Sequence, residues 1–353
     1  MQSNLRATFS NIFVSAALVL VFYLGFALAL ALGYWAFIIL AANSANETLV
    51  RTAPVLGPYL GGGLTLYYTF RIIRLFKGKI DFGLPLHETQ CDELDYLILD
   101  VANDLDVPGP DEIFLSYGPE AFAYEVTLTS DVKRVLCIGW PLVRVLTGAE
   151  LKSVIAHELA HFDNRAFFVH HSIWRLTQSI GKVKAILSNE LSNTVYLAVA
   201  GYLRVIQPLY DGITRNLHYE FEFYCDKQGA ERFGSNIFSG ALTKVVKLQI
   251  CFNDYLERFP NDPANSFFDD FLNYYLQLMS APELDEVMAR VSDENTPSHP
   301  SLNSRIQAVK DIPLQLDVTN PIIQDDDKIR GIQLAVASFY ATAIRSARND
   351  KRN

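Results

Sequence analysis

Long apolar runs dominate the beginning of the chain. Residues 12–42 are almost wholly apolar, and a second uncharged run covers residues 52–70. A helix needs about 20 apolar residues to cross a bilayer, and the first run is much longer than the apolar core of a cleavable signal peptide. The pattern therefore predicts a transmembrane helical hairpin, with spans at about residues 12–42 and 52–70, that forms an N-terminal domain of residues 1–79.

Basic residues beside these runs indicate the orientation of the hairpin. The loop between the runs contains Arg51, and four basic residues follow the second run: Arg71, Arg74, Lys77 and Lys79. Positively charged residues are retained on the cytoplasmic side of a membrane. We therefore expect an integral membrane protein whose remaining residues, 80–353, form a cytoplasmic domain. The expected location is a bacterial inner membrane, and an internal membrane remains an alternative.

Shorter periodic patterns predict the fold class of the second domain. Apolar residues recur at helical spacing from Leu94 to Leu105, and Val107-Pro-Gly-Pro110 ends that helix. Strand-like runs follow at residues 112–117, 121–128 and 134–138, with a turn at Ser130-Asp131. Further helices are expected at residues 236–259, 267–291 and 331–348. The domain is therefore predicted to be α+β and mostly helical, with a small antiparallel sheet.

The most informative local pattern is H-E-x-x-H, formed by His157, Glu158 and His161. Thr147 and Glu150 form a capping box ahead of it, and the apolar residues that follow repeat at helical spacing, so the motif lies on a helix. Residues four apart share one face of a helix, which allows the two histidines to bind one metal ion. The carboxylate next to them can reach a water on that metal without binding the metal itself.

A catalytic zinc site needs a third protein ligand. The acid-rich segment at residues 219–226 offers two carboxylates four residues apart, Glu222 and Asp226. The first could bind the metal while the second accepts a hydrogen bond from the other nitrogen of a ligand histidine. Glu220 competes for the ligand position, but the residue four positions after it is Tyr224, which provides no acid to orient the site.

Composition narrows the possible functions. The 353 residues carry a formal net charge of -9, which argues against nucleic acid as a partner. The cysteines form no C-x-x-C pair, and a chain of this length does not need disulfides, so free, buried thiols in a reducing compartment are expected. The four cysteines are Cys91, Cys137, Cys225 and Cys251.

Three motifs together resemble the HtpX and CAAX-prenyl-protease family (peptidase family M48). They read HELAHFDNR at residues 157–165, EFYCD at 222–226 and SHPSLNSRI at 298–306. The resemblance covers about residues 80–310, and the N-terminal hairpin is similar to the HtpX branch. It implies a zincin-like metalloprotease domain of the gluzincin group.

The resemblance also implies roles for individual residues. It places one Zn²⁺ ion per chain on His157, His161 and Glu222, with Glu158 as the general base. Asp226 would accept a hydrogen bond from a ligand histidine and would not bind the metal itself.

A later motif supplies the remaining expected site residues. The resemblance implies that His299, with Arg305 near it, faces the site and stabilises the transition state. Three positions depart from the family's usual pattern, where Glu120, Tyr219 and Ala166 replace an asparagine, an arginine and an aspartate. None of these is an expected metal ligand, so the departures bear on substrate preference and subfamily.

Residues 167–213 fit several interpretations. A helix is expected at 167–180, where His170 and His171 have no acid at ligand spacing and so do not indicate a second metal. At 194–213 charged and polar residues interrupt an apolar run. A buried or membrane-grazing helix is favoured there over a third span or a pair of spans, because a charge near a helix centre is costly in lipid.

These features predict a membrane-anchored zinc-dependent endopeptidase that hydrolyses peptide bonds in membrane-protein or misfolded-protein quality control. Its expected partners are polypeptide substrates and the lipid bilayer, and the sequence does not indicate an oligomeric state. Two alternatives remain open, a prenyl-protein processing protease and a non-catalytic membrane scaffold with a structural zinc. An edge strand of the sheet would either bind an extended peptide or only cover the core.

Overall fold

The computed structural model describes most of the chain beyond residue 82. Described are residues 83–89, 91–128, 131–163, 218–259, 266–279, 281–296, 299–314 and 325–350, and the single positions 35, 39, 208, 212, 215, 216 and 323. Apart from such single positions, the predicted spans and the stretches at 167–180 and 194–213 lie outside the described residues. Within the described part, no helix combines the length and apolar character that a bilayer crossing requires.

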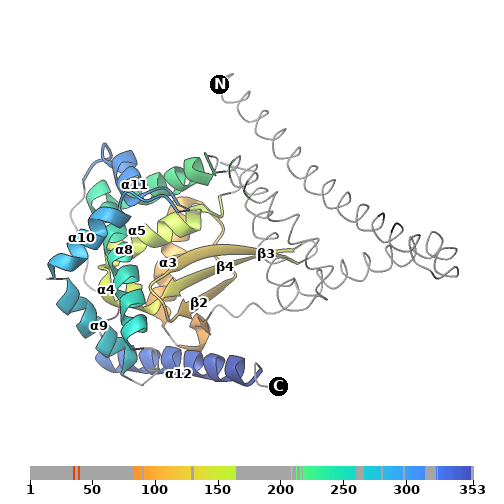
Figure 1. Cartoon of the computed structure of the whole chain (residues 1–353). Helices are drawn as coiled ribbons and strands as arrows, with labels where there is room; N and C mark the ends of the chain where they lie inside the picture. Colours follow the sequence, from red (N-terminus) through yellow and green to blue (C-terminus); the bar gives the residue numbers. More distant parts are fainter. Residues whose placement is uncertain are drawn as a thin grey trace. The chain divides into compact units, whose positions relative to one another are not determined.

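The chain divides into two compact units, one of residues 1–79 with 167–218 and the other of residues 80–166 with 219–353. The labelled helices and strands of Figure 1 lie in the second unit. This unit is mostly helical with one small sheet, which confirms the predicted mixture of elements.

Helix α3 (Asp92–Leu105) forms where the apolar spacing predicts it. Its buried face consists of the predicted stripe with one alanine added: Leu94, Leu97, Ile98, Val101, Ala102 and Leu105. The helix ends at Asp106, which adopts the left-handed conformation with φ 53°. The proline-rich segment that follows cannot continue a helix.

The sheet has four strands in the order β1-β2-β4-β3. These are β1 (Leu84–Pro85), β2 (Glu112–Ser116), β3 (Ala121–Leu128) and β4 (Asp131–Gly139). β3 and β4 pair antiparallel, as predicted for these strands, but Asp131, which was expected in the turn, belongs to β4 and pairs with Leu128. The prediction of an antiparallel sheet is wrong, however, because β4 lies between β2 and β3 and pairs with β2 in parallel, which makes the sheet mixed.

Gly139 explains how β4 can occupy this inner position. The segment that joins β2 to β3 passes the end of β4, and the Gly139 N–H donates to the carbonyl of Glu120 at 2.6 Å. A Cβ atom at position 139 would lie 2.0 Å from the carbonyl oxygen of Gly118. Only glycine permits this close crossing, and apolar patterning alone does not reveal it.

Helices α4 (Trp140–Val145) and α5 (Gly148–Ala160) follow the sheet directly. The predicted capping box is present, since the Thr147 side chain accepts from the Glu150 N–H and the Glu150 carboxylate accepts from the Thr147 N–H. Lys244 of α8 (Ser235–Arg258) also binds the Glu150 carboxylate, at 2.8 Å. α5 is therefore fixed at its start by a cap and by a partly buried ion pair with α8.

The C-terminal helices differ in part from the prediction. The helix expected at 267–291 is two helices, α9 (Phe267–Leu278) and α10 (Pro282–Val291). Pro282 breaks the helix because proline has no backbone N–H to donate and its ring clashes with the preceding turn. α11 (Leu302–Val309) was not expected, and α12 (Asp326–Asp350) begins five residues earlier than predicted. Figure 1 shows α11 near α5 and α12 along the opposite side of this unit.

Aromatic side chains fill much of the core beneath these helices. Tyr117, just after β2, stacks on Tyr340 of α12 with ring centroids 4.2 Å apart and also contacts Phe267 of α9. Phe252 of α8 packs edge-to-face on Phe271. The four cysteines are buried and none forms a disulfide, as expected for a chain that relies on a core of this size.

Candidate metal centre

Two helices approach each other closely where the candidate site forms. Residues 218–233 are helical and pass against α5 at Gly229. A Cβ atom at position 229 would lie 2.8 Å from the carbonyl oxygen of Ser153 in α5 and 2.9 Å from the ring of Phe238 in α8. The missing side chain therefore allows the helix at 218–233 to lie close to the H-E-x-x-H helix.

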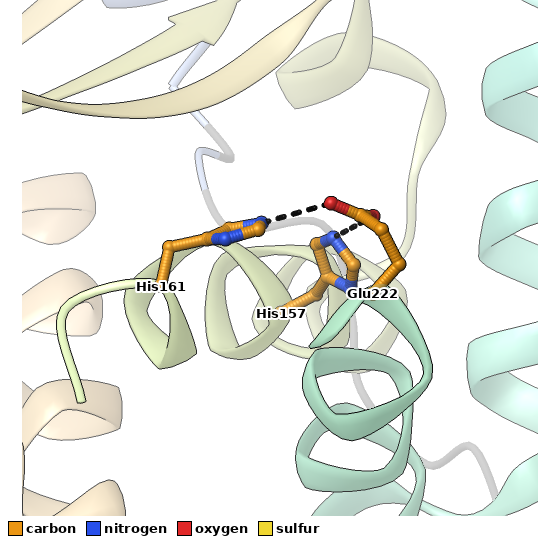
Figure 2. Close-up of side chains that lie close together, drawn as sticks. All are labelled: His157, His161 and Glu222. Atoms are coloured by element: carbon orange, nitrogen blue, oxygen red, sulfur yellow. Dashed lines mark ion pairs between the residues drawn. The ribbon is translucent and has the colours of Figure 1, made fainter. Parts of the chain in front are cut away.

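This approach brings His157, His161 and Glu222 together. Their possible ligand atoms all lie within 4.8 Å of one another. His157 Nε2 is 3.5 Å from Glu222 Oε2, and His161 Nε2 is 3.7 Å from Glu222 Oε1. Figure 2 shows both imidazole rings, carried by α5, facing the carboxylate on the neighbouring helix. Glu220, the competing acid, is exposed and does not belong to this group.

The donor set fits a zinc ion. Two imidazole nitrogens and one carboxylate are a known catalytic zinc set, and ligands about 2.0–2.2 Å from a tetrahedral metal lie roughly 3.3–3.6 Å apart. Both measured separations, 3.5 and 3.7 Å, are close to that value. Glu222 Oε2 is also a buried oxygen that accepts no hydrogen bond from the residues that the structure describes. A buried carboxylate oxygen without a donor is costly unless a cation binds it.

The protonation states suit two of the three candidate ligands directly. Burial alone would raise the pKa of Glu222, but His299, His157 and His161 hold it well below its usual value. Burial lowers the pKa of His161 to about 3. At neutral pH these two groups are therefore a carboxylate and a neutral imidazole, the forms that bind a metal.

His157 differs because it has an acidic partner on each ring nitrogen. Burial acts to lower its pKa, but the adjacent carboxylates of Asp226 and Glu222 outweigh burial and raise the pKa to about 10. Its Nδ1 lies 2.9 Å from Asp226 Oδ1. This contact orients the ring so that Nε2 faces Glu222, which is how carboxylates orient ligand histidines in metal sites.

Arg305 of α11 binds the Asp226 carboxylate that contacts His157. Its Nη2 donates to Asp226 Oδ1 at 2.6 Å and its Nε donates to Oδ2 at 3.0 Å. Asp226 is fully buried, and the Arg305 side chain is only 12% exposed. The pair therefore neutralises a carboxylate that would otherwise be buried with one partner. The structure places both residues at the site, as the motifs led us to expect.

Glu158 lies beside the group but outside it. Its Oε2 accepts a hydrogen bond from the backbone N–H of Ala123 in β3 at 3.0 Å. Burial raises its pKa to about 7, even though His157 acts in the opposite direction. A carboxylate with a pKa near neutrality can both take up and release a proton at physiological pH.

His299 reaches the site from the loop between α10 and α11. Its Nε2 is 3.3 Å from Glu222 Oε2, and its side chain is 43% exposed. The loop is held by Thr296, whose N–H donates to the His299 carbonyl at 3.0 Å and whose own carbonyl accepts from the Tyr219 hydroxyl at 2.8 Å. Sequence reasoning noted Tyr219 only as a departure from the family pattern and did not predict this contact.

A second tyrosine contact was also not predicted. The Tyr224 hydroxyl donates to Asp163 Oδ2 at 2.6 Å, which joins the helix at 218–233 to the end of the H-E-x-x-H segment. The two residues are 61 positions apart, so no local spacing relates them. Both tyrosines follow or precede Glu222 by two or three residues, which is the only sequence signal that could have drawn attention to them.

An H-E-x-x-H helix that meets a carboxylate from a second helix is the arrangement of a metallopeptidase. Comparison with known families agrees, since the sequence model of "Peptidase family M48" matches residues 88–312. The chain therefore belongs to peptidase family M48, which confirms the family predicted from the three motifs.

Two known proteins are similar to parts of the chain. The "Plastoglobule-localized metallopeptidase 48, chloroplastic" of Arabidopsis thaliana is 29% identical over 129 residues, which is 36% of this chain and 35% of that protein. The chain thus matches about a third of that relative's length. The crystal structure of S. mikatae Ste24p is 15% identical, with 83% of this chain and 67% of that one covered, and its TM-score of 0.38 is too low to establish a shared fold.

Proposed function

We propose that the chain is a membrane-anchored, zinc-dependent endopeptidase. In this proposal His157, His161 and Glu222 bind one Zn²⁺ ion, and Glu158 is the general base. The observation that carries it is the meeting of the three candidate ligands within 4.8 Å, with the Glu158 carboxylate beside them and hydrogen-bonded to β3. Family membership makes the chain a metallopeptidase, and the remaining details are the proposal.

The chemistry follows from the placement of the side chains. A bound zinc ion would lower the pKa of a water molecule and polarise the peptide carbonyl. Glu158 is placed to take a proton from the attacking water and to deliver it to the leaving amine. Its pKa of about 7 suits both transfers. His299, at the open side of the site, donates a hydrogen bond to the developing oxyanion of the substrate.

Strand β3 supports cleavage within a chain rather than at its end. Among the described strands β3 pairs with β4, at the end of the sheet order, and a strand in this position is where an extended peptide can add to a sheet. The Ala123 N–H is bonded to Glu158, which places this edge next to the general base. Because β3 extends from Ala121 to Leu128, a paired substrate continues past the site. An active site along a strand edge suits an endopeptidase.

The membrane anchor rests on the hydropathy of the first domain, residues 1–79, with spans at about 12–42 and 52–70. The basic residues after the second span favour a cytoplasmic domain of residues 80–353, and the membrane in this proposal is a bacterial inner membrane. A peptidase next to a bilayer has access to loops of membrane proteins and to misfolded chains, which are the substrates we propose. Reporter domains fused after residue 79 should be cytoplasmic, and a reporter exported from the cytoplasm would contradict this topology.

A non-catalytic scaffold with a structural zinc is less well supported. A structural zinc site has four protein ligands. Among the described residues the cluster contains three, and His299 contacts Glu222 without joining the group. A site with three protein ligands leaves one position for water or substrate, as catalysis requires.

The substitution Glu158→Gln tests the proposal in the purified full-length protein. We expect the variant to retain one zinc per chain and to lose cleavage of an unfolded protein substrate, because an amide cannot take up the proton. Glu220→Gln is the matched control, since it makes the same change at an exposed position of the helix at 218–233. Full cleavage by Glu158→Gln would contradict the role of the base, and cleavage of only a prenylated peptide by the native protein would favour prenyl-protein processing.

A further inference from the structure

We propose that the hydrogen bond between Tyr224 and Asp163 positions His161 for the metal and so strengthens zinc binding. This inference rests on the proposed function, because it concerns how one of the proposed zinc ligands, His161, is held in position. Both residues are positioning residues in this proposal, because the hydrogen bond argued here joins them to each other and not to a ligand atom.

The two candidate histidine ligands are held in different ways. His157 is oriented by a direct contact of its Nδ1 with Asp226, at 2.9 Å. For His161, the described part of the chain contains no hydrogen bond to Nδ1, and its polar contact is with Glu222 itself. Its ring packs on the Phe221 ring at 5.2 Å. The position of His161 must therefore be controlled through its backbone and its packing.

His161 lies at the C-terminal end of α5. α5 ends at Ala160, and His161 is the residue that caps it. The N–H groups of His161, Phe162 and Asp163 donate to carbonyls only three residues earlier, at 2.9–3.2 Å. Such a tightened last turn is typical of a helix end, and helix ends fray when nothing else holds them. A contact at Asp163 can therefore hold the turn that contains His161.

Tyr224 provides this contact from the helix that carries Glu222. Its hydroxyl donates to Asp163 Oδ2 at 2.6 Å, the short distance expected for a hydrogen bond to a carboxylate. Its ring also stacks on Phe221, 6.0 Å away and nearly parallel, and Phe221 in turn packs on His161. The Tyr224–Asp163 hydrogen bond and the packing of Phe221 on His161 thus connect the two ligand-bearing segments, close to His161 and Glu222.

Loss of the bond should weaken the metal site without destroying it. Groups that bond directly to a ligand contribute about tenfold to a hundredfold in metal affinity. The Tyr224 contact acts one step further from the metal, so we expect Tyr224→Phe to raise the zinc dissociation constant by about threefold to tenfold. Phenylalanine keeps the ring and its stacking, so only the hydrogen bond is removed.

The experiment measures zinc affinity of the full-length protein by competition with a metal-binding indicator. Tyr224→Phe and Asp163→Ala should raise the dissociation constant by similar factors, and the double variant should be no worse than the stronger single variant. Asp163→Asn, which keeps an acceptor oxygen, should have a smaller effect. The matched control is Tyr274→Phe, which removes a tyrosine hydroxyl that donates to Asp254 at the contact of α8 and α9.

Thermal unfolding of the zinc-free variants separates positioning from general stability. The control should lower the melting temperature and leave zinc affinity unchanged, whereas Tyr224→Phe should change zinc affinity. Equal zinc affinity in Tyr224→Phe and the native protein would overturn the inference and leave the metal site intact. Failure of the native protein to bind one zinc would instead refute the proposed function.

Discussion

Asp226 binds two partners at once, and its replacement tests how the site is held together. It lies 2.9 Å from His157 Nδ1 and 2.6 Å from Arg305 Nη2, and it is fully buried. The substitution Asp226→Asn keeps the size of the side chain and removes its charge. Arg305, with a side chain only 12% exposed, then remains buried without its main counter-charge.

The expected loss of stability can be estimated from this burial. Removal of one partner of a buried ion pair costs about 3–5 kcal/mol. The carboxylates of Glu222 and Glu158 remain near Arg305, so the lower end of that range applies. With roughly 2–4 °C per kcal/mol for a domain of this size, the zinc-free Asp226→Asn protein should melt roughly 6–12 °C below the native protein. Scanning fluorimetry of the full-length protein in chelator measures this shift.

Zinc affinity should fall as well, for a different reason. Without the carboxylate on Nδ1, the His157 ring is less well oriented, and the zinc dissociation constant should rise by about tenfold to a hundredfold. The double variant Asp226→Asn with Arg305→Met removes both charges, so it should recover part of the melting temperature. It should not recover zinc affinity, because His157 still lacks its carboxylate. Joint recovery of both properties would refute this separation of roles, as would a melting temperature that Asp226→Asn leaves unchanged.

The remaining predictions concern the His299 loop and the protonation of His157. Tyr219→Phe removes the bond to the Thr296 carbonyl and should lower kcat by up to roughly tenfold with little change in KM. In a His299→Ala background it should have no further effect, and an equal loss there would contradict its action through His299. Because the adjacent carboxylates raise the pKa of His157 to about 10, we expect it to be protonated at pH 7.5 and at least one proton to be released when zinc binds. Calorimetry in two buffers of different ionisation enthalpy measures that proton, and a value of zero would contradict the assignment.

Local periodicity explains which parts of the fold could be predicted from the sequence. The capping box of Thr147 and Glu150, the buried stripe of α3 and the hairpin of β3 and β4 depend on residues close in the chain. Such patterns are visible in a single sequence. The order of the strands depends instead on where the connection before β3 crosses Gly139, which no repeat of apolar residues encodes.

The same distinction applies to the candidate site. The spacing of the two histidines and of Glu222 and Asp226 could be read as helix faces, and the structure brings these side chains together. The contact of Tyr224 with Asp163 joins residues 61 positions apart. It becomes visible only once Gly229 has allowed the two helices to approach. Contacts of this kind depend on the packing of helices and not on the pattern within one helix.

The groups at the candidate site come from four separate stretches of chain, and the last of them, at His299 and Arg305, is near the C-terminus. During synthesis the ribosome completes the H-E-x-x-H helix long before α11 emerges. Until then Asp226 lacks Arg305, and His299, the proposed oxyanion donor, is absent. If the proposed function holds, a nascent chain is expected to remain inactive, which would protect the ribosome-bound protein and its neighbours from premature cleavage.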